Sequence, residues 1–271
     1  MLTRIISALI ALPVLIAFVI TGGQWFTAFV AVAGLIATWE LLSMIGPTEA
    51  SAADRGLAAL ALINVPLMLW GAMLGSALAM LAVSSLVLLG FGLLTVYLYP
   101  QHDEIFSSVP KYFLSVGYIA VPLGMIIIIR NMPDGIAWVF FLLVIVFAND
   151  VAAYFVGTRW GRRKLWPAVS PGKTIEGSAG GLAACLILGG VYWGIFLQQF
   201  PLGETLLCVM AIGIAGPLGD LFESVIKRTC GVKDSGRIMP GHGGLMDRVD
   251  AVMITGPYVY LVSIFIHPLV R

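Results

Sequence analysis

Long apolar runs separated by short polar stretches dominate the chain from beginning to end. A helix needs about 20 mostly apolar residues to cross the hydrocarbon core of a bilayer, and several runs approach that length. The pattern predicts an all-α, polytopic integral membrane protein. We expect about nine transmembrane helices, at roughly Ile5–Ile20, Trp25–Met44, Leu57–Leu74, Ala77–Leu98, Tyr112–Ile129, Ile136–Val156, Ala179–Leu197, Leu202–Gly219 and Val249–Ile266.

The number of spans depends on residues 71–76, where the third and fourth runs are hard to separate, so eight spans is the alternative. The basic residues favour nine. In a nine-span model all but two of the 15 Lys and Arg residues fall on the side that also holds the N-terminus, the exceptions being Arg130 and Arg271. By the positive-inside rule that side is the cytoplasm.

Composition narrows the class of protein. Hydrophobic residues make up 60% of the chain and charged residues 11%, which lies outside the range of soluble domains. The first apolar run is not expected to be a cleaved signal peptide, because no small-x-small site follows it before Trp25. The net charge of +1 says nothing about nucleic acid, but no basic stripe with interleaved aromatics exists outside the loops, so we expect no nucleic acid partner.

Charge is distributed unequally between two regions. Residues 1–130 form short-looped spans that we interpret as an N-terminal transmembrane scaffold. Residues 131–271 form a C-terminal catalytic region, because they carry two long charged loops, 157–178 and 220–248, rich in Gly, Pro, Lys, Arg and Asp. No internal repeat is visible, so the inverted-repeat architecture of many secondary transporters has no support.

Acidic residues near the ends of two spans are candidate metal ligands. Asp220 follows an apolar run, and on a continuing helix it shares a face with Glu223 or Ser224 and with Lys227. Asp247 and Asp250 are spaced i and i+3 where the last span begins. Oxygen ligands from both helices could meet at a divalent cation. The alternative, helix capping, fits Asp247 or Asp250 alone but not Asp220 at a C-terminal end.

Asp150 lies inside the sixth predicted span. An ionisable side chain within a span is a candidate functional residue, because its burial without a partner is costly. We expect Asp150 to line a polar cavity open to the cytoplasm rather than to pair with Arg130. A structural ion pair with an interior Lys or Arg is the alternative.

The loop Ser170-Pro-Gly-Lys-Thr-Ile-Glu176 precedes the seventh predicted span. Its Gly-Lys-Thr triplet is not a P-loop, because proline stands at position 167 where that motif needs glycine. Lys173 beside a helix N-terminus with free N–H groups instead makes a phosphate site, with Glu176 in the first helical turn. The basic cluster at 159–164 either binds anionic lipid headgroups or only sets topology.

A second charged stretch extends from Ser224 to Asp250. Glycines around His242 let the backbone approach a ligand closely. His242 either donates a hydrogen bond to phosphate or only stabilises the turn. The stretch also contains three pairs of adjacent charged residues: Lys227-Arg228, Lys233-Asp234 and Asp247-Arg248.

These residues resemble the C-terminal signature of the phosphatidate cytidylyltransferase (CDP-diacylglycerol synthase) family. That signature is a Ser, Lys-Arg, Lys-Asp, a small residue, Pro-x-His-Gly-Gly and Asp-Arg-x-Asp. The loop at 170–177 and the segment around Asp150 extend the resemblance over about residues 148–250. The signature is matched by Ser224, Lys227, Arg228, Lys233, Asp234, Ser235, Pro240, His242, Gly243, Gly244, Asp247, Arg248 and Asp250.

The resemblance implies that CTP and phosphatidate give CDP-diacylglycerol and pyrophosphate, with Mg²⁺ required, in the bacterial-type cytoplasmic (inner) membrane. It implies that Asp220 and Asp247 hold the metal, with Asp250 and Glu223 as further candidates. Phosphates would be held by Lys173, Lys227, Arg228, Lys233 and Arg248, and substrate binding would also involve Ser224, Asp234, His242, Asp150, Ser170, Thr174 and Glu176.

Other readings remain open at this stage. A CTP-dependent lipid-alcohol kinase would need a base for a hydroxyl nucleophile, and an ion-coupled transporter would place its charges near the membrane midplane. A second cation, monovalent or divalent, and a homodimer are also open. Membrane lipids are expected to surround the spans.

Overall fold

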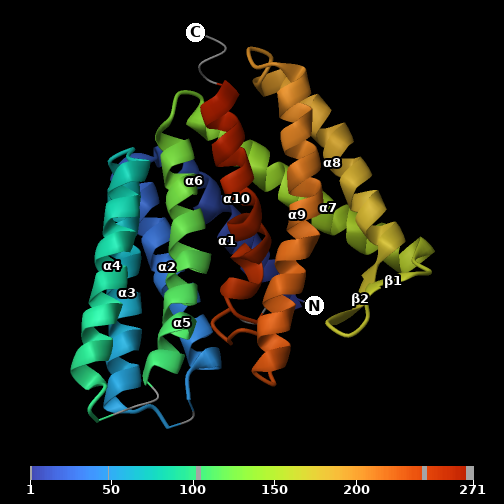
Figure 1. The fold of residues 1–271 in the computed structure, drawn as a ribbon. Helices are drawn as coiled ribbons and strands as arrows, with labels where there is room; N and C mark the ends of the chain where they lie inside the picture. Colours follow the sequence, from blue (N-terminus) through green and yellow to red (C-terminus); the bar gives the residue numbers. More distant parts are fainter. Residues whose placement is uncertain (1, 48, 102–104, 240–242, 267–271) are drawn as a thin grey trace. The chain divides into compact units, whose positions relative to one another are not determined.

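The computed structural model describes residues 2–47, 49–101, 105–239 and 243–266, and it is almost entirely helical (Figure 1). The predicted all-α class is confirmed. The elements are α1 (Leu2–Thr21), α2 (Gly23–Ile45), α3 (Ala52–Met73), α4 (Ala77–Leu98), α5 (Ile105–Ser115), the π-helical turn η1 (Val116–Ala120), α6 (Val121–Asn131), α7 (Gly135–Trp160), β1 (Lys164–Trp166), β2 (Ser170–Thr174), α8 (Ile175–Phe196), α9 (Leu202–Thr229) and α10 (Met246–Ile266).

Eight helices in the described ranges are long and apolar enough to cross a membrane. Each coincides with one of the second to ninth predicted spans, and α5, η1 and α6 together make one of them. The third and fourth spans are separate helices, α3 and α4. The first predicted span corresponds to α1, and the stretch Ala11–Thr21 of this helix is apolar.

Two predicted boundaries were wrong. The expected loop 220–248 begins later, because α9 continues past Gly219 to Thr229. An ion pair between Glu223 and Lys227 at i and i+4 and basic residues in the last turn favour this extension. The expected loop 157–178 is also shorter, since α7 continues to Trp160 and α8 begins at Ile175. Between them lies an antiparallel β1–β2 hairpin that was not predicted.

The chain divides into two compact units. The first comprises residues 1–132 and 234–248. Within it α3 contacts α2, α4, α5, η1 and α6. Its largest fully buried side chains include Leu41, Leu57, Met68 and Ile127. The sequence-based regions divide between residues 130 and 131, whereas in the structure the segment 234–248 groups with the first unit.

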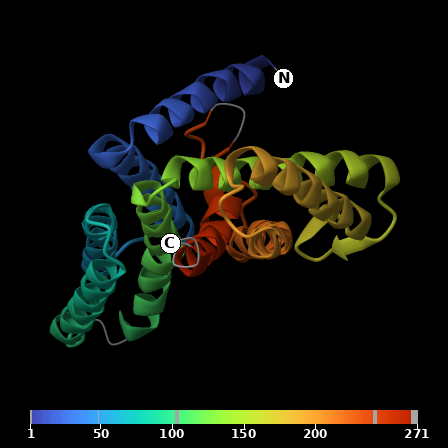
Figure 2. The same ribbon diagram turned by 90° about the horizontal axis from the view of Figure 1, so that it is seen from above.

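The second unit comprises residues 133–233 and 249–271. In it α7 and α8 lie alongside one another, with the β1–β2 hairpin at the end where α7 stops and α8 starts (Figure 2). The buried residues of α8 recur at every fourth position. Small side chains there let two membrane helices approach closely. These positions are Gly177, Gly181, Cys185 and Gly189.

Candidate active site

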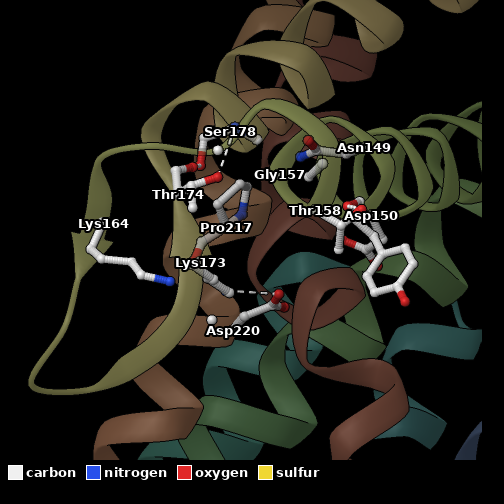
Figure 3. A pocket seen from close by; sticks show the side chains of 15 residues that line it. Asn149, Asp150, Gly157, Thr158, Lys164, Lys173, Thr174, Ser178, Pro217 and Asp220 are labelled. Atoms are coloured by element: carbon white, nitrogen blue, oxygen red, sulfur yellow. Dashed lines mark hydrogen bonds and ion pairs between the residues drawn. The ribbon is translucent and has the colours of Figure 1, made fainter.

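A cavity of about 640 Å³ whose wall includes polar and charged side chains lies in the second unit (Figure 3). Its walls come from the second half of α7, the hairpin, the first turn of α8 and the middle of α9. Asp150, which we expected on the wall of such a cavity, lies there together with Lys173, Thr174 and Asp220. The other polar side chains on the wall are Asn149, Tyr154, Thr158, Lys164 and Ser178.

Lys173 and Asp220 form the central ion pair of this cavity. The Lys173 Nζ lies 2.9 Å from the Asp220 Oδ2 and donates a second hydrogen bond, of 3.1 Å, to the carbonyl oxygen of Pro217. The two side chains are 25% and 28% exposed, so a ligand in the cavity can reach both. The strand β2 and the helix α9 therefore present one positive and one negative group at the same place.

A proline in α9 shapes the neighbouring wall. Pro217 has no N–H, so the carbonyl of Gly213, four residues earlier, loses its helical donor. The buried Asn149 of α7 replaces that donor, since its Nδ2 donates to the Gly213 oxygen at 3.1 Å. In a membrane helix such a freed carbonyl needs a partner from the protein. Asn149 therefore joins α7 to α9 at Gly213, about two helical turns before Asp220.

The hairpin is fixed to the start of α8 by two side chains. Thr174 is the N-cap of α8 and accepts the N–H of Gly177 at 3.1 Å. Glu176 lies in the first turn, as predicted, and its carboxylate accepts the backbone N–H groups of Arg162 and Arg163. Glu176 thus shapes the hairpin that carries Lys164 and Lys173, and it does not line the cavity.

Three carboxyl groups of the second unit lie together at α9 and α10. The Asp250 carboxyl lies close to those of Glu223 and Asp220. Glu223 is fully buried and its Oε1 lies 3.3 Å from the Lys227 Nζ. Within the described ranges, no three His, Cys, Asp or Glu side chains already stand in an arrangement that could hold a metal ion.

Asp247 has a different environment, in the first unit. Its Oδ2 accepts the backbone N–H groups of Ser235, at 3.0 Å, and Gly244, at 2.9 Å. Both donors belong to the loop that precedes α10. One oxygen of Asp247 thus joins two parts of this loop, which we call the signature loop and define as the described residues 234–239 and 243–248.

The remaining candidates are placed along α9, β2 and the signature loop. Arg228 lies in the last turn of α9 and donates to the carbonyl of Val232 at 3.4 Å. Ser224 on α9 and Ser170 in β2 are half-buried, and neither lines the cavity. The side chains of Lys233, Asp234 and Arg248 are exposed. His242 lies outside the described residues.

Sequence reasoning missed two residues that hold these segments in place. One is Asn149, adjacent to Asp150 and paired with the carbonyl that Pro217 leaves free. The other is Glu40 of α2, which binds the signature loop. Both are polar side chains within predicted spans, so the rule that points to Asp150 could have found them as well.

Comparison with known proteins gives a consistent result. Residues 2–266 match the model of the cytidylyltransferase family. The chain is 34% identical to a phosphatidate cytidylyltransferase of Bacillus subtilis, with 97% of each chain covered. It is 35% identical to a protein of the same name from Staphylococcus haemolyticus, covering 97% of this chain and 99% of the relative. A protein of the same name from Staphylococcus aureus is 34% identical, covering 97% of this chain and 99% of the relative.

Proposed function

We propose that this chain, which belongs to the cytidylyltransferase family, is an integral membrane nucleotidyltransferase that transfers the cytidylyl group of CTP to phosphatidate. The products are CDP-diacylglycerol and pyrophosphate. The observation that carries the proposal is the match, over 97% of the chain, to relatives named for this reaction. The bacterial relatives and the distribution of basic residues support a cytoplasmic (inner) membrane location with the cavity facing the cytoplasm.

The chemistry of the cavity suits this reaction. A phosphate monoester has a second pKa near 6, so phosphatidate carries a nucleophilic oxygen at neutral pH without a general base. That oxygen bonds to the α-phosphorus of CTP as the bond from that phosphorus to the pyrophosphate oxygen breaks. The enzyme must hold the reacting groups in line and offset their negative charge. Lys164 and Lys173 on the cavity wall provide positive charge for that purpose.

A divalent cation, Mg²⁺, is part of the proposal. Three carboxyl groups lie close together here, those of Asp220, Glu223 and Asp250. Ionised carboxylates that are close neighbours repel one another unless a cation offsets their charge. Their oxygens are the type of ligand that Mg²⁺ prefers, so these residues would supply suitable ligands once they close around the ion. Bound there, Mg²⁺ would neutralise charge on the transferred phosphate. That Asp247 is a further ligand stays a prediction of the family resemblance, as do a second cation and a homodimer.

Lys173 would have two states in this scheme. Without substrate it neutralises Asp220, at 2.9 Å. With a nucleotide bound, Asp220 would be available to hold a cation, and Lys173 would neutralise a phosphate oxygen instead. The mobile part is a single flexible side chain, since the helix N-cap at Thr174 fixes the backbone next to it.

The test is an assay of the purified protein in detergent micelles with CTP, Mg²⁺ and phosphatidate. Pyrophosphate should be released only when phosphatidate is present, and a CDP-lipid should accumulate in equal amount. Asp220→Asn and Lys173→Met should abolish turnover in protein that remains folded. Conversely, wild-type protein that forms no CDP-lipid under these conditions would refute the proposed function.

A further inference from the structure

We propose that Glu40, in the second helix of the chain, is a positioning residue that holds the signature loop in the conformation needed for cytidylyl transfer. The part of this proposal that concerns activity rests on the proposed function. The part that concerns the loop rests on contacts within the first unit alone. Glu40 is 1% exposed and lies five residues before the end of α2.

Both carboxylate oxygens of Glu40 accept hydrogen bonds from the signature loop. The Oε1 accepts the N–H of Leu245 at 3.0 Å, and the Oε2 accepts the N–H of Met246 at 2.9 Å. The Ser235 hydroxyl also donates to the Oε2, at 3.2 Å. These three donors come from the two ends of the loop. A single side chain of α2 therefore ties both ends together.

The N-terminus of α10 explains why an acid is required. The first N–H groups of a helix have no partner within it, and the helix dipole favours a negative charge at that end. Leu245 precedes α10 and Met246 is its first residue. Glu40 thus caps α10 from another helix, in place of the Ser, Thr or Asp that commonly does so from within the same chain segment.

The loop packs so tightly around Glu40 that it admits only glycine at two positions. A Cβ atom on Gly236 would collide with the Glu40 carboxylate. A Cβ atom on Gly244 would lie 2.6 Å from the Glu40 Oε2 and 2.7 Å from the backbone nitrogen of Gly236. Both glycines therefore lie directly against the Glu40 carboxylate, and a larger residue at either position would displace it.

Asp247 binds the same loop from inside. Its Oδ2 accepts the N–H groups of Ser235 and Gly244, and those two residues also contact Glu40. Loss of Glu40 would therefore loosen the backbone groups that orient Asp247. The family resemblance assigns Asp247, Asp234 and Arg248 to the reaction, and Glu40 acts through them without touching substrate.

A carboxylate inside a membrane span is costly unless the fold uses it. An apolar residue at position 40 would remove that cost in α2 but would leave two amides and a hydroxyl of the loop without their acceptor. The three hydrogen bonds of Glu40 and the two close glycines all involve the signature loop, so we assign Glu40 a role at this loop rather than in the packing of α2.

The decisive variant is Glu40→Gln, compared with Thr38→Val as the matched control. Glutamine keeps the shape but replaces one accepting oxygen with an NH₂ group, so one loop amide loses its partner in either orientation. Thr38 lies on the same helix, is fully buried, and its hydroxyl has no hydrogen-bond partner among the described residues. Ser235→Ala provides a milder variant, because it removes one of the three donors and is expected to fold even where the glutamine variant does not.

Two quantities are measured on each purified full-length variant: hydrogen exchange of the peptide 234–248, and the KM for CTP together with kcat. In Glu40→Gln we expect exchange in this peptide to be at least about tenfold faster, with exchange elsewhere in α2 and α3 unchanged. The KM for CTP should rise several-fold and kcat should fall. Ser235→Ala should show a smaller change of the same kind, and Thr38→Val should match the wild type.

The KM separates a positioning role from a purely structural one, because loss of folded protein lowers kcat but leaves KM unchanged. Unchanged exchange at 234–248 in both Glu40→Gln and Ser235→Ala would overturn the proposal. Faster exchange with an unaltered KM would also overturn it, since the contact would then only support the fold. If the wild type forms no CDP-lipid, the proposed function fails, and the exchange data still decide whether Glu40 holds the loop.

Discussion

The contact between Asn149 and the Gly213 carbonyl exists because Pro217 cannot donate to that carbonyl, and this dependence can be measured. We consider Asn149→Leu, which is nearly isosteric and removes the donor. In the wild-type background the substitution leaves the Gly213 oxygen without a partner inside the protein. In a Pro217→Ala background the alanine N–H can donate to the same oxygen, so the loss of Asn149 should matter much less.

The expected size follows from the contact. Leaving a buried carbonyl unsatisfied costs about 1–3 kcal/mol. Asn149→Leu also removes its own Oδ1, which has no hydrogen-bond partner among the described residues, and that removal offsets part of the cost. The offset is the same in both backgrounds, so it cancels in a double-mutant cycle. We therefore expect a coupling energy of about 1–2 kcal/mol between positions 149 and 217.

The assay is thermal unfolding of the four purified proteins in one detergent: wild type, the two single variants and the double variant. One kcal/mol corresponds to a shift in Tm of about 2–4 °C for chains of roughly this size. Asn149→Leu should lower Tm by several degrees in the wild-type background and by distinctly less beside Ala at 217. Additive Tm changes would refute the reasoning, because Asn149 would then not replace the missing proline donor.

Three further predictions concern the second unit. Asp150→Asn should lower kcat by at least about tenfold, or about 1.4 kcal/mol in transition-state stabilisation; full activity with reduced thermal stability would instead make Asp150 a structural residue. Thr174→Val should lower stability by about 1 kcal/mol through loss of the α8 N-cap, while Thr174→Ser should not, as thermal unfolding will show. In a background without the three native cysteines, Ala168→Cys should react with an impermeant thiol reagent from the cytoplasmic side and Pro133→Cys from the other side; labelling of both from one side would contradict the nine-span topology.

The helical architecture could be predicted because length and hydropathy alone define a membrane span. The same signal misplaced the end of α9. Hydropathy falls at Asp220, but the helix continues for nine more residues because Glu223 and Lys227 pair within it and Lys173 neutralises Asp220. Hydropathy alone therefore predicts a loop where a polar helical segment is stabilised by ion pairs.

The site could be predicted in part. Charge and glycine pointed to Asp150, Lys173 and Asp220, which do line one cavity. Glu40 could have been found as an acid within a predicted span, but its role could not, because two of its three partners are backbone N–H groups and the sequence does not show which amides a fold leaves without acceptors. The close approach of α7 and α8 did leave a signal, the small residues at every fourth position of α8 beginning with Gly177.

The most direct test of the central claim is to follow two labels of CTP separately through one reaction with phosphatidate and Mg²⁺. With CTP labelled at the α-phosphate, the label should enter the lipid together with the cytosine base. With CTP labelled at the γ-phosphate, the label should leave entirely in pyrophosphate. Transfer of the γ-label to a lipid, with release of CDP, would contradict cytidylyl transfer and show a lipid kinase instead.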